Sequence, residues 1–243
     1  MSEMMSDTVF LLDVDNTLLD NDRVIADMRQ HLHAQFGAAA DGYWRVFEAL
    51  RDELGYADYL GALQRFRAGF EHDPSSAHRL LSMSGFLIDY PFAERLYPKA
   101  LAVVARLGTL GTTVILSDGD VVFQPRKVQC SGLWDAVAGR VLIYIHKEHM
   151  LGAVQRRFPA RRYVMIDDKL RILRAMKDIW RDRLITVFPR QGHYASDPTQ
   201  LTRYGVADVN VERIGDLLDF DFGYDFDFDF ALPPATVHQE TRQ

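Results

Sequence analysis

Five short runs rich in β-branched residues alternate along this chain with segments of helical periodicity, and this alternation constrains the fold more than any other feature. Each run is followed by a polar turn, and the helical segments repeat apolar residues at every third or fourth position. The predicted strands span residues 8–14, 112–117, 140–145, 162–167 and 183–188. Such alternation is typical of a parallel sheet with helices on both faces. We therefore predict an α/β fold with a doubly wound, Rossmann-like core.

Residues 20–94 interrupt the alternation. They contain no convincing strand, but three segments within them repeat apolar residues at helical spacing. We expect a helical insert of three or four helices after the first strand, with most of its aromatic side chains packed inside the bundle. The core would then comprise residues 1–19 and 95–243.

The end of the chain, residues 219–243, begins with a repeat of acidic and aromatic residues, DFDFGYDFDFDF, at 219–230. A period of two is compatible with an edge hairpin that turns at Gly223, and the acidic composition is equally compatible with a tail. We expect a surface role for this stretch and no part in the chemistry.

Composition limits the partners of the protein. Its 243 residues are 48% hydrophobic and carry a formal net charge of -6, so they support a large core and no generally basic surface for nucleic acid. The single cysteine, Cys130, has no partner for an internal disulfide, and no stretch approaches the roughly 18 apolar residues of a membrane span. The N-terminus has no leader-like pattern. We expect a cytoplasmic protein that binds neither nucleic acid nor membrane; the oligomeric state stays open.

Acidic residues follow two of the predicted strands. Asp13 and Asp15 end the first, in LLDVDNT, and Asp167 and Asp168 end the fourth, in MIDDK. Alternate side chains of a strand point the same way, so the first pair is expected to reach the carboxyl edge of the sheet together. Like charges at roughly 4 Å repel by on the order of 4 kcal/mol at an effective dielectric near 20. Either one carboxyl group is protonated or a cation lies between them, and four oxygen ligands favour Mg²⁺. A single Asp in such a place would more simply be a helix cap or turn residue.

The other two strand ends carry groups suited to a phosphoryl group. Ser117 and Asp118 follow the second strand in ILSDGD, and Lys147 follows the third in IYIHKEHM. A hydroxyl, neighbouring backbone N–H groups and an ammonium bind phosphate and neutralise charge during its transfer. Taken singly, a serine or lysine at a turn is more often a cap or a solvated charge.

The segments DVDNT, LSDGD, Lys147 and IDDK, in this order and with a helical insert directly after the first, resemble the four motifs of the haloacid dehalogenase superfamily of phosphohydrolases with a C1-type cap. The resemblance covers residues 7–215. It implies that Asp13 is the nucleophile that becomes an aspartyl phosphate. It implies that Asp15 is the general acid and base, with a backbone carbonyl that binds Mg²⁺.

The same resemblance implies roles for the remaining motif residues. Thr17 would orient the first loop, and Asn16 would offer a backbone N–H near the phosphate. Phosphate binding would fall to Ser117, Asp118 and Lys147, with the lysine also pairing with the nucleophile. The pair Asp167 and Asp168 would complete a Mg²⁺ site with Asp13 and Asp15.

Two positions depart from the pattern of that superfamily, and both bear on the substrate. Lys147 is followed by Glu148 where proline is common, and Asp118 stands where many members have asparagine. True dehalogenases lack a carboxylate at the position of Asp15, so this residue favours phosphoryl transfer. We predict a Mg²⁺-dependent phosphatase that acts on a small-molecule phosphomonoester. The alternatives are a phosphomutase of the same superfamily and a catalytically silent binding or regulatory relative.

Substrate specificity is expected to lie in the helical insert. Its candidate contacts are Arg23, Arg45, Tyr56 and Arg65. For each arginine, a solvated helix face is the simpler alternative.

Overall fold

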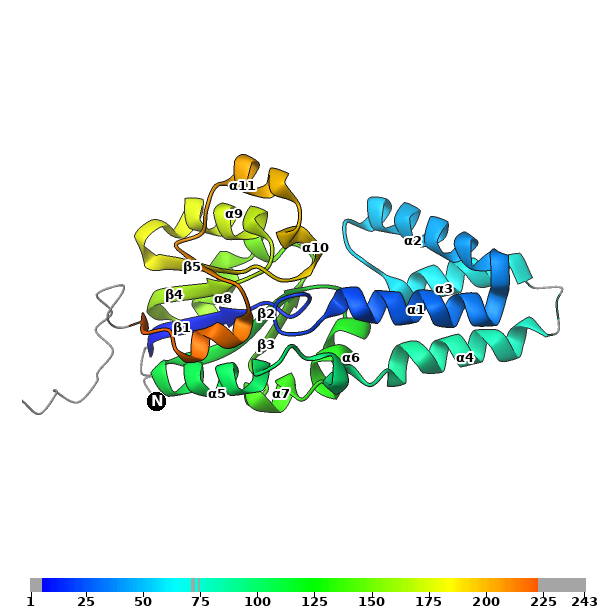
Figure 1. The fold of residues 1–243 in the computed structure, drawn as a ribbon, viewed down its shortest axis with the longest axis horizontal. Coiled ribbons are helices and arrows are strands. Elements are labelled where there is room, and N and C mark those ends of the chain that lie inside the picture. Colours follow the sequence, from blue (N-terminus) through cyan, green and yellow to red (C-terminus); the bar gives the residue numbers. More distant parts are fainter. Residues whose placement is uncertain (1–5, 71–72, 74, 223–243) are drawn as a thin grey trace, which may run out of the picture.

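The computed structural model describes residues 6–70, 73 and 75–222 (Figure 1). Most of the acidic and aromatic repeat, including the predicted turn at Gly223, lies outside the described residues. The part that is described does not form a surface tail, because Phe222 is buried and packs edge-on against Phe10 at a centroid distance of 5.4 Å.

Six parallel strands form a single sheet in the order β3-β2-β1-β4-β5-β6. Their bounds are β1 (Ser6–Leu12), β2 (Thr112–Asp118), β3 (Val141–Tyr144), β4 (Ala160–Ile166), β5 (Leu184–Pro189) and β6 (Val209–Val211). The doubly wound fold and the five predicted strands are confirmed, while β6 is too short to stand out in the sequence. Strand order reverses between β1 and β4, the position at which open α/β sheets bind ligands.

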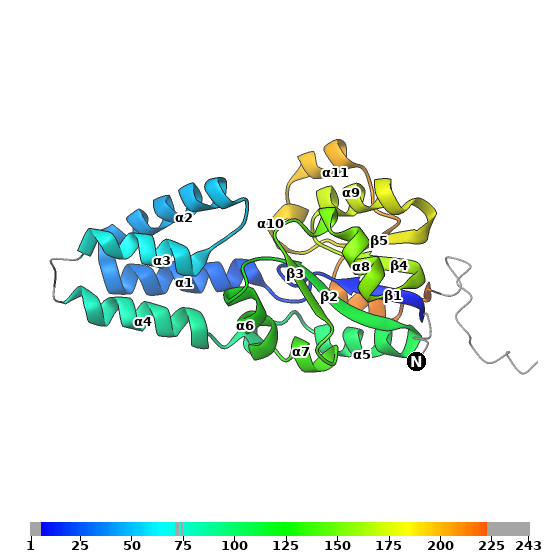
Figure 2. The ribbon, with the colours of Figure 1, turned by 180° about the vertical axis from the view of Figure 1, so that it is seen from behind.

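Helices cover both faces of the sheet (Figures 1 and 2). They are α5 (Ala100–Leu110), α6 (Phe123–Cys130), α7 (Leu133–Ala136), α8 (Leu151–Arg157), α9 (Leu170–Trp180), α10 (Gly192–Ala195) and α11 (Pro198–Tyr204). Alternate side chains of β1 face opposite sides. Phe10 and Leu12 therefore join a cluster with α5, whereas Val9 and Leu11 pack with α8 and α9.

Four α-helices lie between β1 and α5: α1 (Asn21–Phe36), α2 (Ala40–Leu54), α3 (Tyr59–Arg67) and α4 (Ser76–Asp89). Figures 1 and 2 show them extending away from the sheet on one side. Tyr59 stacks on Phe47 at 4.7 Å and contacts Phe123 of α6 at 5.2 Å, so their apolar cluster continues into that of the sheet. The division of the chain into a core and a cap at residues 20–94 stays a prediction.

Short 3-10 helices complete the described structure. They are η1 (Gly37–Ala39), η2 (Ala68–Phe70), η3 (Phe92–Arg95), η4 (Lys147–His149), η5 (Arg181–Arg183) and η6 (Ile214–Leu218). No helix in the described part of the chain has the length and apolarity that a bilayer-spanning segment needs.

Candidate active site

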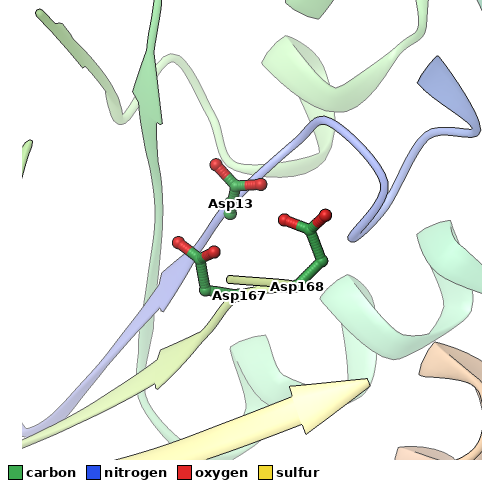
Figure 3. Close-up of side chains that lie close together, drawn as sticks. All are labelled: Asp13, Asp167 and Asp168. Carbon is green, nitrogen blue, oxygen red and sulfur yellow. The ribbon is translucent and has the colours of Figure 1, made fainter. Parts of the chain in front are cut away.

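Three carboxylates converge at the carboxyl edge of the sheet. Asp13, Asp167 and Asp168 are at most 2% exposed, and one carboxylate oxygen of each lies within 4.8 Å of the others (Figure 3). They meet because β1 and β4 are neighbours in register, with Leu12 opposite Ile166. The structure therefore brings three of the four predicted carboxylates together at these strand ends.

The side chain of Asp15 does not join this cluster, contrary to the expectation that four carboxylates converge. β1 ends at Leu12, and Asn16 has a φ of 59°, so the chain has left the extended conformation in which alternate side chains align. The Asp15 carboxylate instead contacts the ammonium of Lys127 at 2.7 Å. Its backbone carbonyl stays a predicted metal ligand.

The ammonium of Lys147 contacts two of the three carboxylates. It is fully buried in η4, and it donates hydrogen bonds to Asp13 Oδ1 and to the Leu116 carbonyl while pairing with Asp167 Oδ2 at 2.7 Å. Burial works against the charged form, but the carboxylates of Asp13 and Asp167 outweigh it and raise the pKa of Lys147 above its usual value. Lys147 is therefore a permanent counter-charge to the acidic cluster.

Asp168 is the least satisfied member of the cluster. Neither of its buried carboxylate oxygens has a hydrogen-bond partner among the described residues. Burial raises its pKa well above the usual value, and burial likewise raises the pKa of Asp167 to about 6. Buried oxygens without donors, beside two further carboxylates, fit a hard divalent cation. The residues present therefore fit Mg²⁺.

Thr17 links the two strand ends. Its buried hydroxyl donates to Asp13 Oδ2 at 3.2 Å and accepts the backbone N–H of Asp168 at 3.0 Å. With Lys147 on Oδ1, both oxygens of Asp13 are held in fixed positions. This agrees with the loop-orienting role that the sequence motif implies.

The predicted phosphate ligands are placed differently. Ser117, 1% exposed at the end of β2, accepts a hydrogen bond from Gln124 of α6 at 3.0 Å. Asp118 accepts the backbone N–H of Lys147 at 2.8 Å, and burial raises its pKa. Asp118 thus supports the segment that carries the lysine while also lining the cavity described below.

The expected role of the Asn16 backbone is not supported. Its N–H donates to the Leu19 carbonyl at 2.7 Å, so it is not free to face a phosphate. This hydrogen bond belongs to the turn between Val14 and Leu19, which leads into α1. The Asn16 side chain exchanges hydrogen bonds with Asp22 and lies against Gly192, where an added Cβ would come within 2.6 Å of the asparagine Cβ.

Sequence reasoning missed two lysines of the site. Lys127 is fully buried and donates to Asp15 at 2.7 Å and to Asn21 Oδ1 at 3.0 Å. The sequence indicates this burial only through spacing: Lys127 follows Phe123 by four residues and so lies on the same, buried face of α6. Lys169, directly after the acidic pair, is the second.

A cavity of about 530 Å³ lies between helices α1 and α2 and the carboxyl edge of the sheet. Asp15, Asp168 and Lys169 line its floor, and side chains of α1 and α2 line its opposite wall. Among the specificity candidates only Tyr56 lines this cavity. Arg23 pairs with Asp27, Arg65 pairs with Glu53, and Arg45 lines a separate hollow on the insert.

Comparisons with protein-family models and with curated proteins found no match. Among solved structures, the chain is similar to a haloacid dehalogenase-like hydrolase from Burkholderia xenovorans LB400, with 64% identity, coverage of 88% of this chain and 99% of that one, and a TM-score of 0.82. It is also similar to a HAD-hydrolase from Bacillus subtilis bound to magnesium, with 14% identity, 93% and 100% coverage and a TM-score of 0.56. The L-2-haloacid dehalogenase from Xanthobacter autotrophicus matches with 19% identity, 88% and 97% coverage and a TM-score of 0.53. The last two likenesses concern the fold alone.

Proposed function

The chain belongs to the haloacid dehalogenase-like family of hydrolases, and on this premise we propose that it is a Mg²⁺-dependent phosphatase of small-molecule phosphomonoesters. The observation that carries the proposal is the buried cluster of Asp13, Asp167 and Asp168, of which the first two pair with the ammonium of Lys147. A second acid, Asp15, lines the adjoining cavity. One carboxylate attacks and the other transfers protons.

Asp13 is the nucleophile in this proposal. Lys147 and Thr17 fix its two oxygens, so the carboxylate is oriented before the substrate binds. One carboxylate oxygen attacks phosphorus, the ester oxygen leaves, and an aspartyl phosphate forms on Asp13. Lys147 offsets the repulsion between the attacking carboxylate and the phosphate dianion.

Asp13, Asp167 and Asp168 would hold Mg²⁺, together with the backbone carbonyl of Asp15. The cation supplies charge neutralisation for the phosphoryl group and for the carboxylates themselves. The two unpartnered oxygens of Asp168 support its assignment as a ligand. The magnesium reported for the Bacillus subtilis relative is in line with this assignment.

Asp15 is the general acid and base. Its side chain is 25% exposed, so it reaches the cavity in which a leaving group would lie. It protonates the leaving oxygen and then takes a proton from the water that hydrolyses the aspartyl phosphate. Lys127 fixes the position of the Asp15 carboxylate, because its ammonium donates one hydrogen bond to Asp15 and another to Asn21.

Lys169 supplies the free hydrogen-bond donors for the phosphoryl group. An ammonium has three N–H donors. That of Lys147 is engaged by protein groups, through hydrogen bonds to Asp13 and to the carbonyl of the β2 residue Leu116 and an ion pair with Asp167. The ammonium of Lys169 lines the cavity beside Asp168 and has no hydrogen bond or ion pair with any described residue. It is thus available to a bound phosphate.

The test is hydrolysis of p-nitrophenyl phosphate by the purified protein with Mg²⁺. We expect equal release of nitrophenol and inorganic phosphate, and loss of both in the Asp13→Asn variant purified in parallel. Because one solved relative is a haloacid dehalogenase, chloride release from 2-chloropropionate is measured alongside. Chloride release without phosphate release would contradict the proposal, and transfer of phosphate to an added sugar phosphate in place of water would favour a mutase.

A further inference from the structure

Most charged side chains that line the cavity already have partners within residues 6–70, 73 and 75–222. Arg51 pairs with Glu48 at 3.1 Å, Arg171 with Glu148 at 2.6 Å and Asp15 with Lys127 at 2.7 Å, while Asp118 and Asp120 accept backbone N–H groups. The side chains of Arg29, Lys169 and Asp168 are left without a hydrogen bond or ion pair. The proposed chemistry uses Asp168 and Lys169. It gives no role to Arg29.

Arg29 faces the cavity from the insert. It shares one face of α1 with Asn21 and Ile25 at a spacing of four residues, and all three line the cavity. Its guanidinium stacks on the ring of Trp44 in α2 at 3.9 Å from the centroid. Stacking occupies the face of the guanidinium plane and leaves the N–H donors at its edge free.

The spacing of residues along α1 gives the approximate distance between Arg29 and the Asp15 end of the cavity. Asn21 is joined to Asp15 through the ammonium of Lys127. Arg29 follows Asn21 by eight residues, which at 1.5 Å per residue is about 12 Å along α1. Helix side chains lean towards the N-terminus of their helix, so the guanidinium leans back towards the sheet. The two ends of the cavity therefore lie within the reach of one small molecule.

We propose that the leaving group of the substrate carries a carboxylate, and that Arg29 binds it. This inference rests on the proposed function for the phosphate end of the molecule. A guanidinium edge matches a carboxylate with two parallel hydrogen bonds. Glu48, the acidic side chain that lines the cavity from α2, is paired with Arg51 and leaves Arg29 free for a ligand. Trp44, Phe47 and Tyr56 line the wall around it, which suits a flat or apolar body between the two anionic ends.

The probes are two aryl phosphates that differ in one charge, 4-carboxyphenyl phosphate and its neutral amide, 4-carbamoylphenyl phosphate. We expect the wild-type protein to prefer the carboxylate. Arg29→Met should lower kcat/KM for the carboxylate by about 10- to 100-fold, the loss of a charge-assisted hydrogen bond, and change the amide by less than about threefold. The matched control is Arg45→Met, which removes an exposed arginine of α2 that does not line this cavity.

Each outcome either supports or overturns the carboxylate site at Arg29. If Arg29→Met lowers both substrates equally, or neither, the carboxylate site is wrong even though the phosphatase function stands. If the wild-type protein hydrolyses neither probe nor p-nitrophenyl phosphate, the proposed function fails, and calorimetric titration with 4-carboxyphenyl phosphate still tests Arg29. Binding that is equal in wild type and Arg29→Met would overturn the inference, and binding lost only in Arg29→Met would sustain it.

Discussion

Replacing Lys169 by methionine tests the assignment of the phosphoryl-binding cation. Burial works against its charged form, yet the carboxylates of Asp168, Asp13 and Asp167 outweigh burial and raise the pKa of Lys169 above its usual value. The side chain is thus charged at neutral pH. Because its ammonium has no hydrogen bond or ion pair with a described residue, the substitution removes a charge without leaving a broken bond in the protein.

The expected magnitudes separate chemistry from folding. Loss of a preorganised donor to a charged transition state costs about 10²- to 10³-fold in kcat, and we expect a loss in this range for Lys169→Met. With saturating Mg²⁺, its free energy of unfolding should change by about 1 kcal/mol or less. Lys147→Met should behave differently, because it leaves the carboxylates of Asp13 and Asp167 buried beside each other. Breaking such a buried pair costs about 3–5 kcal/mol.

The assay combines steady-state hydrolysis of p-nitrophenyl phosphate with urea unfolding of the same preparations. The control is Lys99→Met, which makes the same chemical change at an exposed position away from the cavity. Mg²⁺ should bind Lys169→Met at least as tightly as wild type, because a neighbouring positive charge has gone. Turnover of Lys169→Met within about threefold of wild type, far from the loss expected for a donor, would refute the assignment.

Two further predictions concern the metal and the base of the insert. Chelation should abolish hydrolysis, and Asp168→Asn should weaken the rise in Tm that Mg²⁺ produces, because a neutral amide replaces a buried carboxylate ligand; an unchanged Mg²⁺ response would remove Asp168 from the site. On α1, burial favours the neutral form of Asp27, but hydrogen bonds from Tyr90 and Arg95 outweigh it and hold the pKa of Asp27 below its usual value. Asp27→Asn should therefore cost about 1–2 kcal/mol of unfolding free energy at pH 7. Since the folded-state pKa is the lower one, this difference should narrow as pH falls below about 4, towards and through that pKa. A difference that stays constant between pH 7 and pH 3 in urea unfolding would contradict the ion-pair explanation.

Much of the fold follows from local sequence signals. Continuous β-branched runs mark strands that are buried on both faces, and the carboxyl ends of parallel strands share one edge, which is why Asp13 and Asp167 were expected to meet. The strand β6 was not predicted, because its three residues are too few to show a periodic pattern. The packing of Phe222 against Phe10 was not predicted, because the acidic residues next to Phe222 in the sequence are typical of a solvated tail.

The site was less predictable wherever it depends on tertiary contacts. The orientation of Asp15 is set by Lys127, which lies 112 residues further along the chain on α6. The alternation of side chains along a strand carries no information about such a long-range contact. The N–H of Asn16 is used by the turn itself. Arg29 was indistinguishable from other insert arginines until the structure showed which of them lack a partner and line the cavity.

The central claim is that Asp13 and Asp15 divide nucleophilic and proton-transfer roles, and trapping the covalent intermediate tests it most directly. Rapid acid quench of the Asp15→Asn variant with p-nitrophenyl phosphate, followed by peptide mass spectrometry, should find phosphate on Asp13. A good leaving group needs little protonation, whereas hydrolysis of the aspartyl phosphate lacks its base. The Asp13→Asn variant should yield no phosphorylated peptide. Phosphate on another residue, or equal labelling of both variants, would contradict this account.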